Sequence, residues 1–201
     1  MMNLEECKRA FLARTEQYLR EGHDRFAAAR FVAEVAGGLE GPALDVGTGK
    51  GFLAMALARR GLAVVSADVN EEDSALAALL VREAGLHDYI RFVLEDARSL
   101  PFPDGYFGCA AMMDVLHHLG DATPVLGEMV RVVRPRGKIL VADFSEGGFE
   151  VVAAVHRTEG HEHPRSAVTV DTARAVLAAA GWELCGETLG HLHRVAWFES
   201  E

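Results

Sequence analysis

The chain has 201 residues, half of them hydrophobic, and a formal net charge of −10, which fits one domain with one large core. The acidic balance repels phosphate backbones and argues against nucleic acid as a partner. The charged first residues do not resemble a signal peptide, and no apolar run approaches the roughly 20 residues that cross a bilayer. We therefore expect a soluble, cytoplasmic protein with no membrane span. No feature of the sequence predicts the oligomeric state.

The first part of the chain has the periodicity of helices. Residues 4–36 read as helical, with a predicted break at His23. We interpret residues 1–40 as a helical N-terminal arm, or lid, and residues 41–201 as the body of the same domain. Tyr18 and His23 are candidate substrate contacts on the arm, although aromatic residues at helical spacing more often serve packing.

Three alternating glycines follow the first apolar strand. Gly47, Gly49 and Gly51 let the backbone turn sharply and leave room for a ligand against the main chain. A dinucleotide fingerprint would need glycine where Phe52 stands, and a P-loop would need Ser or Thr directly after Lys50. Neither phosphate-binding pattern is therefore present.

The remaining pattern is GxGxG, preceded two residues earlier by Asp45. It resembles the first motif of class I S-adenosylmethionine (SAM)-dependent methyltransferases. The resemblance implies that Asp45, Thr48 and the glycines bind the methionine moiety of SAM. The alternative is an ordinary strand-to-helix turn that uses glycine for geometry alone.

The second apolar strand ends at Asp68, 17 residues beyond Gly51. This is near the spacing at which an acidic residue meets ribose hydroxyls in nucleoside-binding α/β folds, and a carboxylate suits a vicinal diol. Val69 belongs to the same predicted cofactor site. Asp68 could instead cap the helix that begins at Glu71, but Asn70 is the better capping candidate.

A third strand, over residues 89–94, runs into Asp96, Ala97 and a Leu-Pro-Phe-Pro-Asp sequence over residues 100–104. This loop resembles the adenine-binding loop of the methyltransferase type 11 group, which includes quinone-biosynthesis methyltransferases. The Asp96 carboxylate can accept a hydrogen bond from the exocyclic amine of adenine. The Ala97 N–H can donate to a ring nitrogen of the same base.

The fourth strand, from residue 107, ends in a polar loop that also matches the family pattern. The resemblance assigns Met113 and Asp114 to the cofactor. His117 and His118 become candidate catalytic bases, because histidine titrates near neutral pH. The alternative is that both histidines merely shape the cofactor pocket.

The remaining predicted elements are a helix over 123–133, a strand over 138–144, a helix over 172–180 opened by Asp171, and strands over 182–188 and 194–198. The resemblance implies an α/β fold, a single Rossmann-like three-layer sandwich. Its seven-stranded, mostly parallel sheet has the order 3-2-1-4-5-7-6 with strand 7 antiparallel. Asp143, at the end of strand five, is a candidate substrate residue.

The segment over residues 155–164 is the least typical of the family. His156 is a tentative catalytic residue, and His161 and His163 are tentative substrate residues. The three imidazoles could bind an anionic acceptor, abstract its proton, or hold a divalent metal. A solvated connection is the alternative, and we expect no stoichiometric metal.

The resemblance implies an enzyme that transfers the methyl group of SAM to a small-molecule acceptor by SN2 displacement, with S-adenosylhomocysteine (SAH) as product. Only an alcohol or carbon acid acceptor would need a base. Two alternatives stay open, a non-catalytic SAM-binding or regulatory protein and a nucleotide-dependent oxidoreductase on a related fold. The sequence predicts neither the acceptor nor the atom that is methylated.

Overall fold

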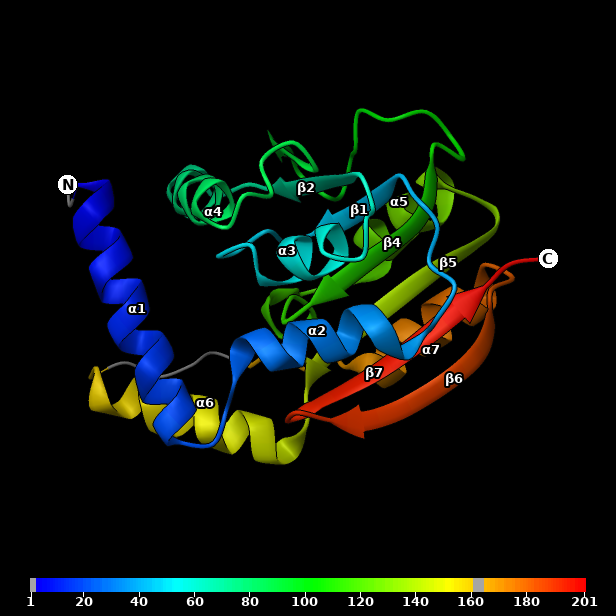
Figure 1. Cartoon of the computed structure of the whole chain (residues 1–201). Coiled ribbons are helices and arrows are strands. Elements are labelled where there is room, and N and C mark those ends of the chain that lie inside the picture. Colours follow the sequence, from blue (N-terminus) through cyan, green and yellow to red (C-terminus); the bar gives the residue numbers. More distant parts are fainter. Residues whose placement is uncertain (1–2, 161–164) are drawn as a thin grey trace.

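The computed structural model describes residues 3–160 and 165–201. Seven strands form one sheet that is flanked by helices (Figure 1). The strands are β1 (Ala43–Val46), β2 (Val64–Asp68), β3 (Ile90–Leu94), β4 (Phe107–Met113), β5 (Val133–Phe144), β6 (Glu183–Gly190) and β7 (His193–Glu199). Their order is β3-β2-β1-β4-β5-β7-β6, and β7 is antiparallel to both of its neighbours. The predicted order and the antiparallel last strand are therefore confirmed.

Alternation of side chains along the strands places helices on both faces of the sheet. The helices are α1 (Leu4–Arg20), α2 (Arg25–Val35), α3 (Phe52–Ala58), α4 (Glu71–Glu83), α5 (Thr123–Val132), α6 (Glu146–Thr158) and α7 (Val170–Ala179). Leu44 and Val46 pack with residues of α5 and α7, whereas Ala43 packs with residues of α2, α3 and α4. The result is the expected three-layer sandwich, with an apolar core on each side of the sheet.

The carboxyl ends of three parallel strands meet at one edge of the sheet. Val46 at the end of β1 lies opposite Ala67 of β2 on one side and Met112 of β4 on the other. From β1 the chain adds β2 and β3 on one side of the sheet, and it then crosses to add β4 on the other side of β1. The direction in which strands are added therefore reverses at β1. In open α/β sheets this is the place where ligands bind.

Helix α1 stands apart from the sheet and reaches toward α6 at its C-terminal end (Figure 1). It contacts α4, α6 and α2. Lys8 pairs with Glu83 of α4, and Arg14 pairs with Glu159 just beyond α6 at 2.8 Å. The helix therefore bridges two elements on opposite sides of the ligand-binding edge. No helix within residues 3–160 and 165–201 combines the length and the apolar character needed to cross a bilayer.

The predicted break between two N-terminal helices is confirmed, but the starts of β5 and α7 and the structure around His156 differ from the prediction. Strand β5 begins at Val133 rather than at residue 138, with an irregular register and a left-handed Arg136 (φ 61°) near its start. Helix α7 is capped by Thr169, whose side chain accepts from the Thr172 N–H, and not by Asp171. His156 lies in the last turn of α6, so this part of the histidine-rich segment is helical.

Candidate functional site

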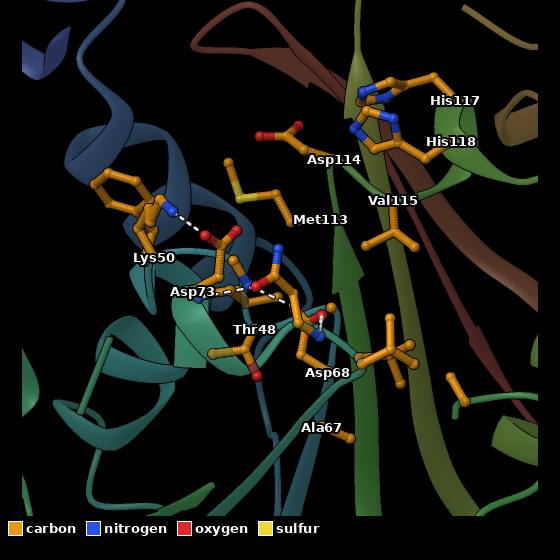
Figure 2. Close-up of a pocket in the computed structure, with 18 of the residues that line it drawn as sticks. Thr48, Lys50, Ala67, Asp68, Asp73, Met113, Asp114, Val115, His117 and His118 are labelled. Carbon is orange, nitrogen blue, oxygen red and sulfur yellow. Dashed lines mark hydrogen bonds and ion pairs between the residues drawn. The ribbon is translucent and has the colours of Figure 1, made fainter. Parts of the chain in front are cut away.

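A cavity of about 1280 Å³ lies at the carboxyl ends of β1, β2 and β4. Its walls come from the loops that follow these strands and β3, and from α1, the first residue of α2, and α6. Figure 2 shows Asp68 and Thr48 toward one end and Asp114, His117 and His118 toward the other, with Met113 between them. The volume exceeds the roughly 300–1,000 Å³ of a typical small-molecule site, so it leaves room for two ligands.

Most of the predicted site residues line this cavity. They are Tyr18, Gly47, Thr48, Gly49, Asp68, Val69, Asp96, Ala97, Met113, Asp114, His117, His118 and His156. Asp45, Gly51, His23 and Asp143 do not line it. His161 and His163 lie outside the residues that the structure describes.

The glycine loop uses its glycines for two different purposes. Both Gly47 and Gly49 have left-handed backbones, with φ of 84° and 46°. A Cβ on Gly47 would lie 2.3 Å from Cγ2 of Val115, so packing excludes a side chain there. A Cβ on Gly49 would meet no atom within 4 Å and would point into open space. The open cradle at Gly49 fits a ligand that lies against the main chain.

Asp45 is buried behind the glycine loop and does not line the cavity, so its predicted contact with the cofactor stays a prediction. Its side chain is buried, and Oδ2 accepts from Ser66 Oγ at 2.6 Å. The Ser66 hydroxyl in turn lies 2.7 Å from Thr48 Oγ1, which places it between Asp45 and the glycine loop. Oδ1 accepts no hydrogen bond from any described residue. Burial raises the pKa of Asp45 to about 7, although the Ser66 hydrogen bond acts in the opposite direction.

Asp68 joins the glycine loop to the end of β2. Its Oδ2 accepts from the Gly49 N–H and its Oδ1 from the Asn70 N–H, both at 2.9 Å. Each carboxylate oxygen keeps a further lone pair, which a ribose hydroxyl can use. Asn70, and not Asp68, caps α4, as predicted.

Asp96 has a close partner that the sequence did not reveal. Its carboxylate accepts from the backbone N–H, Nε and Nη2 of Arg98 at 2.5 to 3.0 Å. These hydrogen bonds lower the pKa of Asp96 to about 2. An adenine amine would have to share this carboxylate with Arg98, so the predicted contact is weaker than the motif alone suggests.

His117 and Asp143 form a buried pair. Asp143 Oδ1 lies 2.6 Å from Nδ1 of His117, and its Oδ2 accepts from the His117 backbone N–H at 2.9 Å. Asp143 is only 3% exposed and does not line the cavity, so the contact that the structure shows is with His117, and the predicted substrate contact stays a prediction. The His118 ring lies 4.0 Å from that of His117. Partial burial, and then the neighbouring His117, lower the pKa of His118.

A second histidine–aspartate pair was not predicted. His193, at the start of β7, places Nε2 2.8 Å from Asp114 Oδ1 and Nδ1 2.8 Å from the His191 carbonyl oxygen. Both partners are acceptors, so this geometry favours the imidazolium, with a proton on each nitrogen. Burial alone would lower the pKa of His193, but the charge and hydrogen bond of Asp114 outweigh burial and raise it. No local motif marks His193, because its partner is 79 residues away.

The arm contributes aromatic and cationic side chains to the cavity wall. Tyr18 lines the cavity as predicted, and Arg25 lines it without having been predicted. The Arg25 guanidinium lies 5.0 Å from the Tyr18 ring centre and 4.4 Å from that of Phe52. His23 is buried against Tyr18 and Phe144 and does not line the cavity, so its predicted substrate role stays a prediction. Burial lowers the pKa of His23 to about 4.

His156 connects the cavity wall to the arm. Its Nε2 lies 2.8 Å from Nη2 of Arg14 on α1. Over the described ranges, no group of three or more histidine, cysteine, aspartate or glutamate side chains is arranged to hold a metal ion. His156 therefore helps to hold α1 against α6 through its contact with Arg14.

Comparison with known proteins gives matches to methyltransferases. Residues 44–141 match the family model described as a methyltransferase domain. Methyltransferase GfsG of Streptomyces halstedii is 35% identical over 145 residues, which cover 70% of this chain and 52% of that protein. The ubiquinone/menaquinone biosynthesis C-methyltransferase UbiE of Vibrio cholerae is 31% identical over 134 residues, 64% of this chain and 51% of that protein.

Among solved structures, that of the [4+2]-cyclase SpnF superimposes with a TM-score of 0.66 and 27% identity, covering 81% of this chain and 58% of that one. The chain spans about half the length of the curated relatives that it matches.

The sheet order, the motifs at the strand ends and the matched family model agree with one another. Residues 44–141 therefore form a methyltransferase domain of the class I SAM-dependent family.

Proposed function

We propose that this protein binds SAM and transfers its methyl group to a small-molecule acceptor, releasing SAH. One observation carries the proposal: the cavity at the strand ends extends from the glycine loop to the arm and is large enough for two ligands. Its two ends differ in chemistry, with open main chain and a carboxylate at one end and histidines and aromatic rings at the other. This is the arrangement that a two-substrate transfer needs.

The glycine-loop end fits SAM. The open space at Gly49 would receive the methionine moiety, Asp68 the ribose diol, and the Ala97 N–H the adenine ring. When bound, SAM supplies a methyl group that its sulfonium already activates. The protein then has to align the acceptor and exclude water, and neither task requires covalent chemistry by the chain.

The arm end would enclose the acceptor. Tyr18 of α1 and Val152 of α6 both line the cavity, and Arg14 ties the two helices together through Glu159 and His156. We infer that residues 1–40 act as a lid on the domain of residues 41–201. A closed lid excludes water from the transfer site.

His117 is the best-placed base for an acceptor with an acidic O–H or C–H group. A carboxylate at Asp143 can accept the Nδ1 proton of His117, which would direct proton uptake to Nε2. The double contact of Asp143, to the ring and to the backbone, fixes the ring orientation. His118 and His156 line the same cavity and are the other candidates for this role.

A second candidate function has a specific observation in its favour. The structural neighbour SpnF, which is 27% identical to this chain, is described as a [4+2]-cyclase. A protein of similar fold is thus named for a reaction other than methyl transfer. The same cavity could therefore bind SAM without transferring its methyl group, as a non-catalytic or regulatory protein. An oxidoreductase is disfavoured, because the glycine loop lacks the dinucleotide pattern.

Calorimetric titration with SAM, SAH and NAD(P), followed by incubation of metabolite pools with methyl-labelled SAM, tests these alternatives. We expect SAM and SAH to bind, NAD(P) not to bind, and label to appear in a small molecule. Asp68→Ala should weaken SAM by about 10- to 100-fold, because it removes a charged acceptor from the site. Binding without any transfer would favour the non-catalytic alternative, and binding of NAD(P) instead of SAM would overturn both.

A further inference from the structure

Tyr18 is a buried tyrosine whose hydroxyl group has no hydrogen-bond partner within residues 3–160 and 165–201. The residue is only 5% exposed, and it lines the cavity. Its hydroxyl oxygen is not completely enclosed by protein atoms, whereas both ring nitrogens of the neighbouring His23 are. A buried tyrosine normally finds a partner for its hydroxyl group, because an unpaired polar group costs free energy. The hydroxyl group of Tyr18 is therefore available to a ligand in the cavity.

Contacts from several elements hold the Tyr18 ring in place. The residue lies in the last turn of α1, where α1 contacts α6 (Figure 1). Its ring packs with Val152 and Val155 of α6. The His23 ring lies edge-on to it at 5.6 Å, and the Arg25 guanidinium lies 5.0 Å from its centre. A ring that is held on several sides presents its hydroxyl group in one direction, so little ordering is needed when a ligand binds.

The hydroxyl group of Tyr18 keeps its proton at neutral pH. Burial raises its pKa above the ordinary value of 10.0. The positive charges of Arg25 and Arg14 act in the opposite direction, and the negative charges of Glu159 and Asp114 add to the effect of burial. A neutral phenol group has one O–H donor, so Tyr18 can donate a hydrogen bond to an oxygen of the ligand.

Phe144, at the end of β5, lies between Tyr18 and the His117–Asp143 pair. It packs in one apolar cluster with Tyr18 and Val152, and its ring lies 5.5 Å from that of His117. Tyr18, Phe144, Val152 and His117 all line the cavity. A ligand on the apolar surface of Phe144 and Val152 is therefore flanked by the Tyr18 hydroxyl group and the His117 imidazole.

The charged groups that α1 and α6 bring to this part of the wall are paired with each other. Arg14 forms an ion pair with Glu159 at 2.8 Å. Partial burial lowers the pKa of His118, so this imidazole is mainly neutral at neutral pH. A carboxylate or an ammonium group would lose its hydration here and would have to compete with a formed ion pair. The described wall therefore favours an uncharged ligand with an oxygen that accepts from Tyr18.

We propose that Tyr18 donates a hydrogen bond to an oxygen of the methyl acceptor, and that the acceptor is a neutral weak oxygen acid, either a phenol or an enolisable carbonyl compound. The inference rests on the proposed function, in which this end of the cavity holds the acceptor. His117 takes the proton of the acceptor O–H group, or of a C–H group next to its carbonyl. The electron pair forms a phenolate or enolate, whose oxygen accepts from Tyr18.

The remaining step conserves charge and atoms. The oxygen of the anion, or its conjugated carbon, takes the methyl group of SAM, and the electrons of the broken C–S bond stay on sulfur as SAH leaves. The imidazolium of His117 then releases its proton to water. Tyr18 keeps its own proton throughout, so its role is to stabilise the anion and to select an acceptor that can form one.

The test is calorimetric titration of small probes into the full chain saturated with SAH. Phenol represents one kind of weak oxygen acid and acetylacetone the other, and the tighter of the two identifies the kind of acceptor. Benzoate and benzylammonium carry a charge instead, and both should bind more weakly than the tighter oxygen acid. Tyr18→Phe keeps the ring and should weaken that oxygen acid by about three- to tenfold, with SAH affinity within about threefold. Tyr89→Phe, at an exposed tyrosine that does not line the cavity, is the matched control and should change nothing.

A coloured phenol gives a readout that packing alone would not change. The phenolate of 4-nitrophenol absorbs visible light and its neutral form does not. With SAH bound, the ionised fraction of the bound probe should exceed that of the free probe at the same pH, because His117 takes the proton and Tyr18 donates to the phenolate. Tyr18→Phe should reduce the acidity of the bound probe by about tenfold, the effect of one hydrogen bond to a charged oxygen.

The outcomes separate this role of Tyr18 from the proposed function. Failure of SAH to bind wild-type protein would refute the proposed function before any probe is added. With SAH bound, tighter binding of benzoate or benzylammonium, or no binding of phenol or acetylacetone at millimolar concentration, would overturn the acceptor class. Unchanged probe affinity and unchanged ionisation of 4-nitrophenol in Tyr18→Phe would show that Tyr18 only packs α1 against α6. Equal weakening of SAH would assign its hydroxyl group to the cofactor instead.

Thermal unfolding without ligand checks the fold of the variant. Because the hydroxyl group has no partner among the described residues, Tyr18→Phe should not lower the melting temperature. The order of probe affinities and the ionisation of 4-nitrophenol in wild-type protein do not depend on any variant. A marked loss of stability in Tyr18→Phe would contradict an unpaired hydroxyl group and overturn the proposal.

Discussion

The two ends of the cavity are built differently. At the glycine-loop end, the loop after β1 and the acid at the end of β2 contact each other through backbone groups, as when Asp68 accepts from the Gly49 N–H. At the arm end, the wall depends on side chains that are distant in sequence. His117 and Asp143 are 26 residues apart, Asp114 and His193 are 79, and Arg14 and His156 are 142. The first end therefore depends on two neighbouring strand ends whose contacting residues are 19 apart, and the second on side chains up to 142 residues apart.

The largest expected effect is at the glycine-loop end. Gly49→Val should weaken SAM by at least about 100-fold, because the new side chain would point into the cradle and a β-branched residue strains a left-handed backbone. Gly61→Val is the matched control, since Gly61 is also left-handed (φ 83°) with open space at its Cβ and does not line the cavity. Calorimetry and thermal unfolding of both variants measure the difference. Equal loss of SAM binding in both would show that backbone strain, and not occlusion, is responsible.

The next effect is at the arm end and should appear in turnover alone. Asp143→Asn removes the charge that fixes the His117 tautomer and should lower methyl transfer to a weakly acidic acceptor by about 100-fold or more. SAM affinity should stay within about threefold, because Asp143 does not line the cavity. The rate measured across pH 5 to 9 is the discriminating readout, since a base on His117 predicts a rate that rises with pH and a changed midpoint in the variant. An unchanged pH profile would reduce Asp143 to a packing role.

The same contrast explains what the sequence could predict. The sheet order follows from the resemblance to the family. The residues at the glycine-loop end follow from motifs at strand ends, because parallel strands bring their carboxyl ends to one edge. The burial of Asp45 could not be predicted, because a motif gives a residue's position in sequence but not the direction of its side chain. His193 and Arg25 were missed for a different reason. Each gains its role from partners on other elements, and nothing in the flanking residues distinguishes it from an ordinary surface or core residue.

A smaller effect concerns stability at the glycine-loop end. Burial raises the folded-state pKa of Asp45 from 3.8 to about 7, so the native state keeps a proton that the unfolded chain has lost. The contribution of this proton to the free energy of unfolding is complete below about pH 4 and is lost as pH rises through about 7. Between pH 5 and pH 8 Asp45 should therefore cost the wild type of the order of 3 kcal/mol of unfolding free energy. This loss should be absent in Asp45→Asn, whose amide oxygen can still accept from Ser66.

Urea unfolding at both pH values measures this loss as a difference between wild type and variant. Asp88→Asn, at a side chain that is 86% exposed, is the control and should not change the pH dependence. Identical pH dependence in wild type and Asp45→Asn would contradict a buried carboxyl that holds its proton.

The smallest effect has the opposite sign and lies at the arm end. Burial lowers the folded-state pKa of His23 from 6.5 to about 4, and neither ring nitrogen has a hydrogen-bond partner among the described residues. The unfolded chain therefore binds a proton before the native state does, and the stability present above about pH 6.5 is lost as pH falls through about 4. His23→Phe keeps a ring against Tyr18 and Phe144 but has no group that titrates. It should therefore remove this acid-induced loss of unfolding free energy, which is at most about 3 kcal/mol. Chemical unfolding at pH 7 and pH 4.5 should show a smaller acid destabilisation in the variant than in wild type. An equal acid destabilisation would mean that His23 is already paired in the native state, and that the arm end gains its acid sensitivity from His193 and its neighbours instead.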